Sequence, residues 1–301
     1  MAGLAARVDL LQKAATTNGG LLIPLQTDAP TPNAILLKSG RPNSTLFCVH
    51  PLGGGISPYL SFAESIVDEA SVYGFTLWDQ TGRSIVVDSI PKIARSYIEQ
   101  MMDLQKDGPY LLSGWSSGGI IAHEMACQLS DKGKTVDMLA IIDAYPPSEL
   151  SYSAKDRSLG IWYTLLDLFG LSHRRSQVRD PKFLDLTQDE KITLVLSTLK
   201  REKSISTIPS REQLLYYMES IKEFRSAAIA HEYRKYSGEV SLFLAEITPV
   251  STSIAVDFWR KHSTMLLVDM IPGDHLSIMQ GTAVRKIADR VNKKFSEHPL
   301  Q

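Results

Sequence analysis

The feature that most constrains this sequence is the segment Ser113–Gly119, which reads Ser-Gly-Trp-Ser-Ser-Gly-Gly. A short apolar run, Tyr110–Leu112, precedes it, and a helix-like run, Ile120–Ala126, follows it. A strand, a tight glycine turn and a helix, with Ser116 at the apex, form the setting that a G-x-S-x-G nucleophile elbow requires. The segment therefore predicts a strand-to-helix turn that exposes one serine hydroxyl.

The glycines on both sides of Ser116 have a steric role in this prediction. Gly114 and Gly118 stand where the strand and helix backbones pass close together, so a Cβ at either position would clash. The N–H groups that open the next helix would face negative charge developing beside Ser116. Because G-x-S-x-G also occurs by chance, a glycine-rich turn with an inert serine is the alternative.

Length and composition place the chain among ordinary globular proteins. Its 301 residues are enough for one large domain, or for one domain with an insertion. The formal net charge of −1 argues against a nucleic-acid partner or a polybasic membrane surface. Cys48 and Cys127 lie in apolar runs, which indicates buried thiols rather than a disulfide framework or a metal site. With no membrane-length apolar run and no signal-peptide core, we expect a cytoplasmic protein.

Strands and helices are expected to alternate along much of the chain. Apolar runs predict buried strands at residues 44–50, 71–77, 135–143, 238–246 and 264–271. Helical spacing of apolar residues predicts helices at 90–105, 253–262 and 283–296. Alternation at this spacing is typical of an open, mostly parallel α/β sheet.

The alternation breaks after residue 147. From 148 to 236 there is no candidate buried strand, and three helical stretches are expected at about 157–171, 188–202 and 210–236. An all-helical insertion after a strand that ends in a carboxylate is well placed to cover an active site. The alternative is a helical layer that packs on the sheet.

A nucleophilic serine needs a base, and the base needs an orienting acid. In α/β-hydrolases these residues follow in the order Ser, Asp or Glu, His. His275 follows the last predicted strand and is the strongest candidate base after Ser116. Asp143 and Glu246 each end a predicted strand, and topology alone does not separate them. Asp274 adjoins the histidine, but neighbouring loop side chains diverge, so we expect it to point elsewhere.

A glycine-rich loop, His50–Gly55, follows the first clear strand. Pro51 ends strand pairing, and the glycines permit an unusual backbone path. In a hydrolase of this topology, such a loop supplies the second backbone N–H of an oxyanion hole. The alternative is a flexible connection. His123, one helical turn past the elbow, is expected to be structural.

Four motifs together carry a family resemblance. They are Leu46–Gly54, Gly114–Gly119, Ile142–Pro147 and Gly273–His275. On these motifs the sequence, from Leu22 onward, resembles the thioesterase domains that end nonribosomal peptide synthetases, with related domains ending polyketide synthases. The resemblance implies an α/β-hydrolase fold, with a mostly parallel sheet flanked by helices over residues 34–147 and 237–301. It also implies an all-helical lid insertion at 148–236.

The resemblance assigns roles to individual residues. It implies Ser116 as nucleophile, His275 as base and Asp143 as orienting acid, because the family's acid follows the strand after the elbow. The backbone N–H groups of Leu52 and Ser117 would form the oxyanion hole. The domain itself would bind no cofactor or metal. Its substrate would be a peptidyl or acyl thioester on the phosphopantetheine of a carrier domain, released by hydrolysis or intramolecular cyclisation.

The N-terminal region fits the same resemblance. Residues 2–15 look helical, and residues 1–15 resemble the tail of an upstream peptidyl carrier domain, which would be the partner. Residues 16–33 have the composition of a linker. A stand-alone carboxylester hydrolase, a polyketide-synthase-type thioesterase and a non-catalytic binding module of the same fold are the alternatives.

One segment of the sequence departs from the family pattern, and another lies outside the four family motifs. Tyr73–Asp79 replaces a segment that is Gly-Leu-x-x-Pro-Gly-like in many members, so the pocket near Trp78 is expected to be unusual. The basic cluster His173–Arg175, with Arg179, is either a solvated lid loop or a contact for an acidic carrier domain or an anionic substrate.

Overall fold

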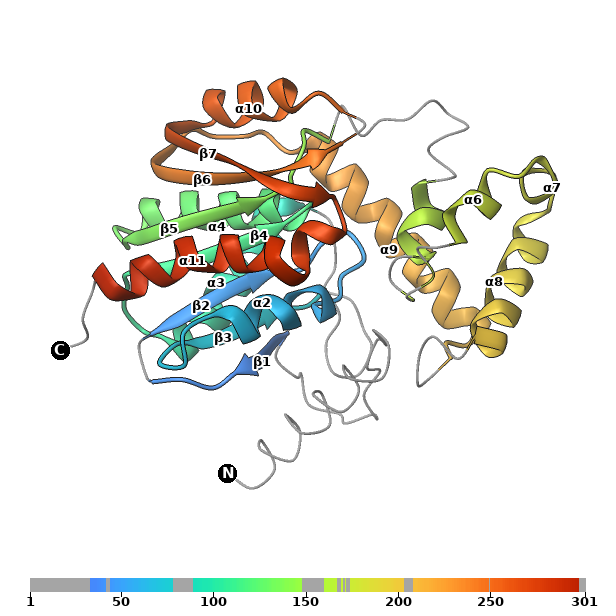
Figure 1. Ribbon diagram of the computed structural model, residues 1–301, viewed down its shortest axis with the longest axis horizontal. Coiled ribbons are helices and arrows are strands. Elements are labelled where there is room, and N and C mark those ends of the chain that lie inside the picture. Colours follow the sequence, from blue (N-terminus) through green and yellow to red (C-terminus); the bar gives the residue numbers. More distant parts are fainter. Residues whose placement is uncertain are drawn as a thin grey trace.

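Seven strands form one sheet with helices on both faces, and further helices lie beyond one edge of the sheet (Figure 1). The computed structural model describes residues 33–41, 44–77, 89–147, 160–166, 169, 171, 174–202, 208–248 and 250–297. The expected carrier-domain tail (1–15), nearly all of the linker, Trp78 and His173 lie outside these residues.

The sheet is mostly parallel, as predicted. Its strands are β1 (Ala34–Lys38), β2 (Thr45–Val49), β3 (Ser71–Phe75), β4 (Tyr110–Trp115), β5 (Val136–Ile142), β6 (Tyr236–Ile247) and β7 (Ser263–Asp274). Their order is β1-β3-β2-β4-β5-β6-β7, with every neighbouring pair parallel except β1 and β3. The carboxyl ends of β2 to β7 therefore share one edge of the sheet, where open α/β folds carry their sites.

Helices cover the two faces of the sheet and create two hydrophobic cores. Helices α2 (Leu60–Ser65) and α11 (Gly281–Glu297) lie on one face, and α3 (Ile90–Leu104), α4 (Gly118–Asp131) and α10 (Thr252–Lys261) lie on the other. Side chains of β2 alternate between the cores: Leu46 and Cys48 face one, and Phe47 and Val49 face the other. This alternation explains the continuous apolar run, because a strand buried on both faces has no solvent-facing side chain.

Helix α3 shows why the periodicity in the sequence was informative. Its expected apolar face is the face that is buried in the structure: Ile90, Ile93, Ala94, Tyr97, Ile98 and Met101. These side chains pack into the core that α3 shares with α4. Among the described helices, none is long and apolar enough to cross a membrane.

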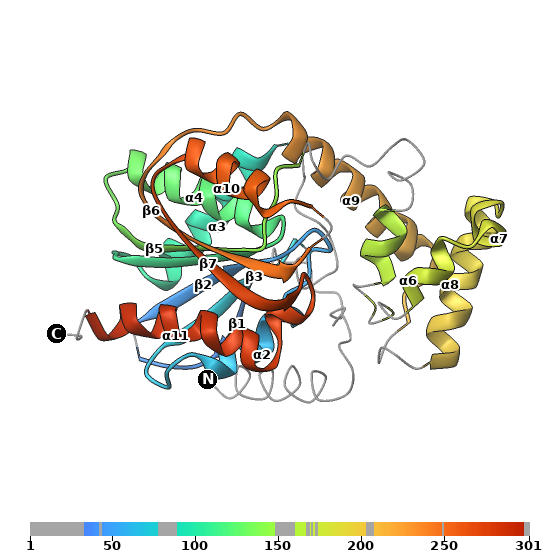
Figure 2. The same cartoon turned by 45° about the horizontal axis from the view of Figure 1, so that its top comes forward.

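The insertion between β5 and β6 is helical wherever it forms regular structure among the described residues. It contains a helical segment at 160–166, α6 (Arg175–Val178), α7 (Pro181–Leu184), α8 (Gln188–Glu202) and α9 (Arg211–Ala230). Figure 2 shows these helices beyond the carboxyl ends of the strands, with the long α9 reaching back to the core. We call this group the lid.

Several expected boundaries were wrong. The helix expected to run to residue 236 ends at Ala230, because His231 turns to an extended conformation (φ −69°, ψ 130°) that leads the chain back to the sheet. The short helices α6 and α7 were not expected separately. The last strand continues to Asp274, three residues past its expected end. The edge strand β1 was missed because it has only five residues and follows a linker-like segment.

Candidate active site

The elbow has the geometry that its sequence predicts. Ser116 lies between β4 and α4 with φ at +57°, in the left-handed region that side chains rarely adopt. Its backbone N–H donates to Ile142 O at 2.8 Å, and its carbonyl accepts from Gly119 N at 3.0 Å. These two bonds tie the strained residue to the end of β5 and to the first turn of α4.

The flanking glycines are required by close backbone contacts, as expected. A Cβ on Gly114 would lie 2.3 Å from Gly118 O, and a Cβ on Gly118 would lie 2.3 Å from Val49 O. Both neighbours are backbone atoms that cannot move away without shifting β2 or α4. The glycines therefore allow the strand, the helix and the preceding strand to converge beneath Ser116.

The side chains of His275 and Asp143, the predicted base and acid, meet beside the elbow. His275 Nδ1 and Asp143 Oδ2 are 2.6 Å apart. The Asp143 side chain is only 1% exposed, whereas that of His275 is 39% exposed. Asp143 Oδ1 also accepts from Ala245 N at 3.0 Å, which fixes the direction of the carboxylate. An Nδ1–H that donates to a carboxylate leaves Nε2 as the basic nitrogen of the imidazole.

The backbone of Asp143 is held as firmly as its carboxylate. Its φ of +45° is the second non-glycine value in the left-handed region among the described residues. Its N–H donates to the carbonyl oxygen of Phe243, in the neighbouring strand β6, at 2.7 Å. Strained backbone of this kind persists where the surroundings over-determine it, and such positions cluster at functional sites.

The two other candidate acids do not make this contact. Glu246 is exposed at the end of β6. The Asp274 carboxylate turns into its own loop and accepts hydrogen bonds from Ser277 N, Ser277 Oγ and Leu276 N. The bonds from Ser277 lower the pKa of Asp274 below its usual range. Asp274 therefore shapes the loop that presents His275, and it points elsewhere as expected.

Trp115 connects the histidine to the elbow. This buried residue immediately precedes Ser116, and its indole stacks on the His275 ring with centroids 5.1 Å apart and an interplanar angle of 29°. The stacking places the imidazole over the residue next to the serine. The structure thus brings Ser116, Asp143 and His275 to one edge of the sheet, although they come from three distant loops.

The two expected oxyanion donors are the backbone N–H groups of Leu52 and Ser117. Within the described part of the chain, neither Leu52 N–H nor Ser117 N–H has a hydrogen-bond partner. Leu52 lies in the loop after β2, where Gly54 N donates to Pro51 O at 2.8 Å and Gly54 has a φ of +74°. Ser117 is the residue before α4. The described residues therefore leave the hydrogen-bonding capacity of both N–H groups unused.

The buried histidines near the site have packing roles. His123 Nε2–H donates to His262 O at 2.9 Å, and His50 Nδ1–H donates to Pro51 O at 2.8 Å. Burial lowers the pKa of each of these histidines to about 4, so both stay neutral. The structural role expected for His123 is confirmed. Among the described residues, no three His, Cys, Asp or Glu side chains are grouped as a metal site.

One residue that links the strand ends beside the elbow was not predicted from the sequence. The hydroxyl of Tyr59, a fully buried residue in the short helix η1 (Ser57–Tyr59), lies between Val49 O and Trp115 N. A single tyrosine in a loop region has no periodic signal, so a contact 56 residues away was not visible in the sequence.

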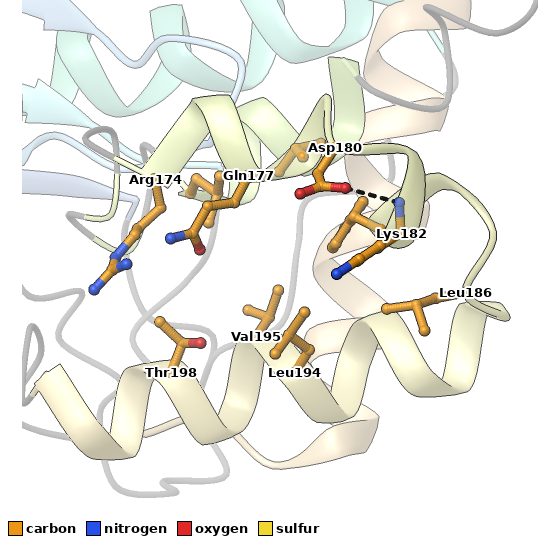
Figure 3. A pocket seen from close by; sticks show the side chains of 11 residues that line it. Arg174, Gln177, Asp180, Lys182, Leu186, Leu194, Val195 and Thr198 are labelled. Atoms are coloured by element: carbon orange, nitrogen blue, oxygen red, sulfur yellow. Dashed lines mark hydrogen bonds between the residues drawn. The ribbon is translucent and has the colours of Figure 1, made fainter.

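The lid contains a pocket of about 410 Å³ between α6, α7 and α8 (Figure 3). Its wall is mainly apolar, and its lining residues include Leu166, Val178, Phe183, Leu186, Leu194 and Val195. None of the proposed catalytic residues lines it. Arg174, which lines the pocket, pairs with Glu202. Elsewhere in the lid, Arg179 Nε donates to Tyr163 Oη at 2.7 Å. Two arginines from the basic region singled out in the sequence thus take part in contacts within the lid.

Comparison with known proteins identifies the family. A profile described as "Thioesterase domain" matches residues 44–295. The chain belongs to this thioesterase family. Two curated relatives are Malpibaldin synthetase of Mortierella alpina, 38% identical over 109 residues, and a dimodular nonribosomal peptide synthase of Bacillus subtilis (strain 168), 33% identical over 146 residues. The matches cover 36% and 48% of the thioesterase chain, but only 2% and 6% of these long relatives.

Solved structures share the fold of the thioesterase. A four-domain nonribosomal peptide synthetase, holo-AB3403 bound to AMP and glycine, aligns with a TM-score of 0.75 at 22% identity over 92% of this chain and 21% of that chain. The Vlm2 thioesterase domain aligns with a TM-score of 0.64 at 19% identity over 88% of this chain and 98% of that domain. These alignments support the α/β-hydrolase fold expected from the sequence.

Proposed function

We propose that this thioesterase is the chain-releasing domain of a nonribosomal peptide synthetase, with Ser116 as nucleophile, His275 as base and Asp143 as orienting acid. The observation that carries the proposal is the 2.6 Å contact between His275 and the buried Asp143, beside a serine held at φ +57°. The similarity to a dimodular nonribosomal peptide synthase supports the choice of substrate class.

The first half-reaction forms an acyl-enzyme. A peptidyl or acyl thioester arrives on the phosphopantetheine of an upstream carrier domain, which is the partner in this proposal. Ser116 Oγ attacks the thioester carbon while its proton passes to His275 Nε2. The N–H groups of Leu52 and Ser117 stabilise the oxyanion, and one such donor is typically worth about 3–4 kcal/mol of transition-state stabilisation. The thiol leaves with the proton from His275, and the chain stays on Ser116 as an ester.

The second half-reaction releases the chain. His275 takes a proton from a second nucleophile, which attacks the ester carbonyl, and then returns the proton to Ser116 Oγ. Water yields the free acid, whereas an amine or hydroxyl of the chain itself yields a macrocycle. A lid that excludes water and folds the chain favours cyclisation. No step requires a cofactor or a metal.

Turnover of an acyl N-acetylcysteamine thioester and of the matching simple oxyester tests this proposal. We expect a higher kcat/KM for the thioester, and a loss of at least about 10³-fold in kcat for Ser116→Ala. Ser61→Ala, at an exposed position of α2, is the control and should retain the wild-type rate. Unchanged turnover by Ser116→Ala would overturn the proposal.

The alternatives predict other results in the same experiment. A carboxylester hydrolase would prefer the oxyester, although Ser116→Ala would still be inactive. A non-catalytic binding module would turn over neither substrate, and a serine-directed fluorophosphonate would not label it. Mass spectrometry of the thioester products then distinguishes hydrolysis from cyclisation.

A further inference from the structure

The hydroxyl of Tyr59 joins two segments that the proposed mechanism uses. It donates to Val49 O at 2.7 Å and accepts from Trp115 N at 2.6 Å. The Tyr59 side chain is fully buried, so water does not compete for either bond. Burial also raises the pKa of Tyr59 well above its usual value, which keeps the hydroxyl protonated and able to donate.

The two partners of this hydroxyl are the last residues of neighbouring parallel strands. Val49 ends β2, and Trp115 ends β4. Each strand leads directly into one of the proposed oxyanion donors: Leu52 lies three residues after Val49, and Ser117 lies two residues after Trp115. The Tyr59 hydroxyl therefore lies at the base of both segments that carry the donors.

Other hydrogen bonds restrain the oxyanion loop in different directions. Gly54 N donates to Pro51 O at 2.8 Å, which closes a turn within the loop. Leu77 N donates to Gly54 O at 3.0 Å, which attaches the loop to the chain just after β3. The Tyr59 hydroxyl instead attaches the last residue of β2, where the loop starts, to the last residue of β4, next to the elbow.

We infer that Tyr59 is a positioning residue that sets the separation between the Leu52 and Ser117 N–H groups. This inference rests on the proposed function, since it assigns these groups to the oxyanion hole. Without the hydroxyl, Val49 O and Trp115 N–H both lose a partner, and the ends of the two strands shift to satisfy them. A donor displaced by about 1 Å can lower the rate about 100-fold. Tyr59 would thus act on the transition state through the backbone, without touching substrate.

Tyr59→Phe tests this inference, with Tyr110→Phe as the matched control. Tyr110 is also fully buried, and its hydroxyl donates to Lys106 O at 3.0 Å and Gln105 O at 3.2 Å at the opposite end of β4. Both variants remove a buried hydroxyl, and only one of them lies at the proposed oxyanion hole. Kinetics with an N-acetylcysteamine thioester are measured at a temperature where both variants are folded. They separate the effect of losing any buried hydroxyl from the effect of losing the hydroxyl at the proposed oxyanion hole.

We expect Tyr59→Phe to lower kcat at least tenfold with KM changed less than twofold, and Tyr110→Phe to keep the wild-type kcat. The rate of labelling by a fluorophosphonate should fall with kcat, because the phosphonyl oxygen uses the same donors. Equal kcat values in the two variants would overturn the inference.

Two further measurements keep the test decisive. If Tyr59→Phe does not fold, 4-aminophenylalanine at position 59 keeps a donor of similar size but accepts poorly from Trp115 N–H. We expect the variant with 4-aminophenylalanine at position 59 to have a severalfold lower kcat, and the variant with the same residue at position 110 to keep the wild-type kcat. An unchanged kcat for the variant at position 59 would overturn the inference. Ser116→Ala, measured in parallel, tests the proposed function separately. If this variant kept its activity, the proposed function would be wrong, regardless of the result for Tyr59→Phe.

Discussion

His275 Nδ1 and Asp143 Oδ2 lie 2.6 Å apart although the two residues are separated by 132 positions in the sequence. The lid and the last two strands of the sheet lie between them along the chain. The contact forms because β5 and β7 both end at the same edge of the parallel sheet. Their loops then meet beside the elbow that holds Ser116.

Removing the charge of Asp143 tests its role as the orienting acid. In Asp143→Asn, the amide no longer holds His275 in the tautomer with a free Nε2. If the proposed triad operates, we expect kcat to fall by about 10⁴-fold, which is the loss that this change causes in a Ser-His-Asp triad. Glu246→Gln, at an exposed strand end, should keep the wild-type rate. A large loss in Glu246→Gln alone, measured with the same thioester, would reverse the assignment.

A methyl group at Gly118 should disrupt the elbow. Its Cβ would lie 2.3 Å from Val49 O, so β2 or α4 must shift. We expect Gly118→Ala to lower the free energy of unfolding by about 3 kcal/mol or more, in the upper range for overpacking. Gly133→Ala is the control: its Cβ would meet no atom within 4 Å, and only its φ of +67° opposes the change. A cost of about 1 kcal/mol is expected there. Urea unfolding measures both, and equal losses would contradict the steric explanation.

The buried histidines should make stability depend on pH. Burial lowers the pKa of His50 and of His123 to about 4, whereas both protonate near pH 6.5 in the unfolded chain. Between these pH values the unfolded state binds more protons. The free energy of unfolding therefore falls as the pH is lowered from 6.5 to 4, by about 1.4 kcal/mol per pH unit for each histidine.

Urea unfolding at several pH values between 7 and 4.5 measures this dependence. His123→Gln removes one of the histidines with a lowered pKa, so its curve should be shallower than that of the wild type by about 1.4 kcal/mol per pH unit. Parallel curves for the two proteins would show that His123 does not resist protonation in the folded state.

Trp259 should support the acid through the backbone. Its indole N–H donates to the carbonyl of Ala144, the residue after Asp143, at 2.8 Å, and its side chain is fully buried. Trp259→Phe leaves that carbonyl unpaired, so we expect a loss of about 1–3 kcal/mol in stability and a severalfold lower kcat. Phe258→Leu, on the same helix and in contact with the rings of both Tyr233 and Trp259, leaves the indole N–H in place, so it should lower stability without lowering kcat. Calorimetry and thioester kinetics on both variants provide the comparison.

Sequence reasoning predicted the features that depend on local pattern. The elbow, the buried strands and the apolar face of α3 each leave a signal within a few residues, namely glycine spacing, continuous apolar runs or helical periodicity. The edge strand β1 was missed, because five residues at a sheet margin after a linker-like segment carry a weak signal.

Features that depend on long-range contacts were not accessible in the same way. Asp143 and Glu246 both end strands at one sheet edge, so strand order alone did not distinguish them. Only the fold shows that the Asp143 carboxylate is buried against Ala245 N while Glu246 faces solvent. The hydroxyl of Tyr59 bridges two strand ends through a contact that no sequence pattern marks.

Mass spectrometry of the intact protein during a single turnover tests the central claim most directly. With a slowly released acyl N-acetylcysteamine thioester, we predict a transient mass increase equal to the acyl group, mapped by peptide digestion to Ser116. Ser116→Ala should show no adduct and no thiol release above background. Thiol release by Ser116→Ala at the wild-type rate, or an adduct on another residue, would contradict the account.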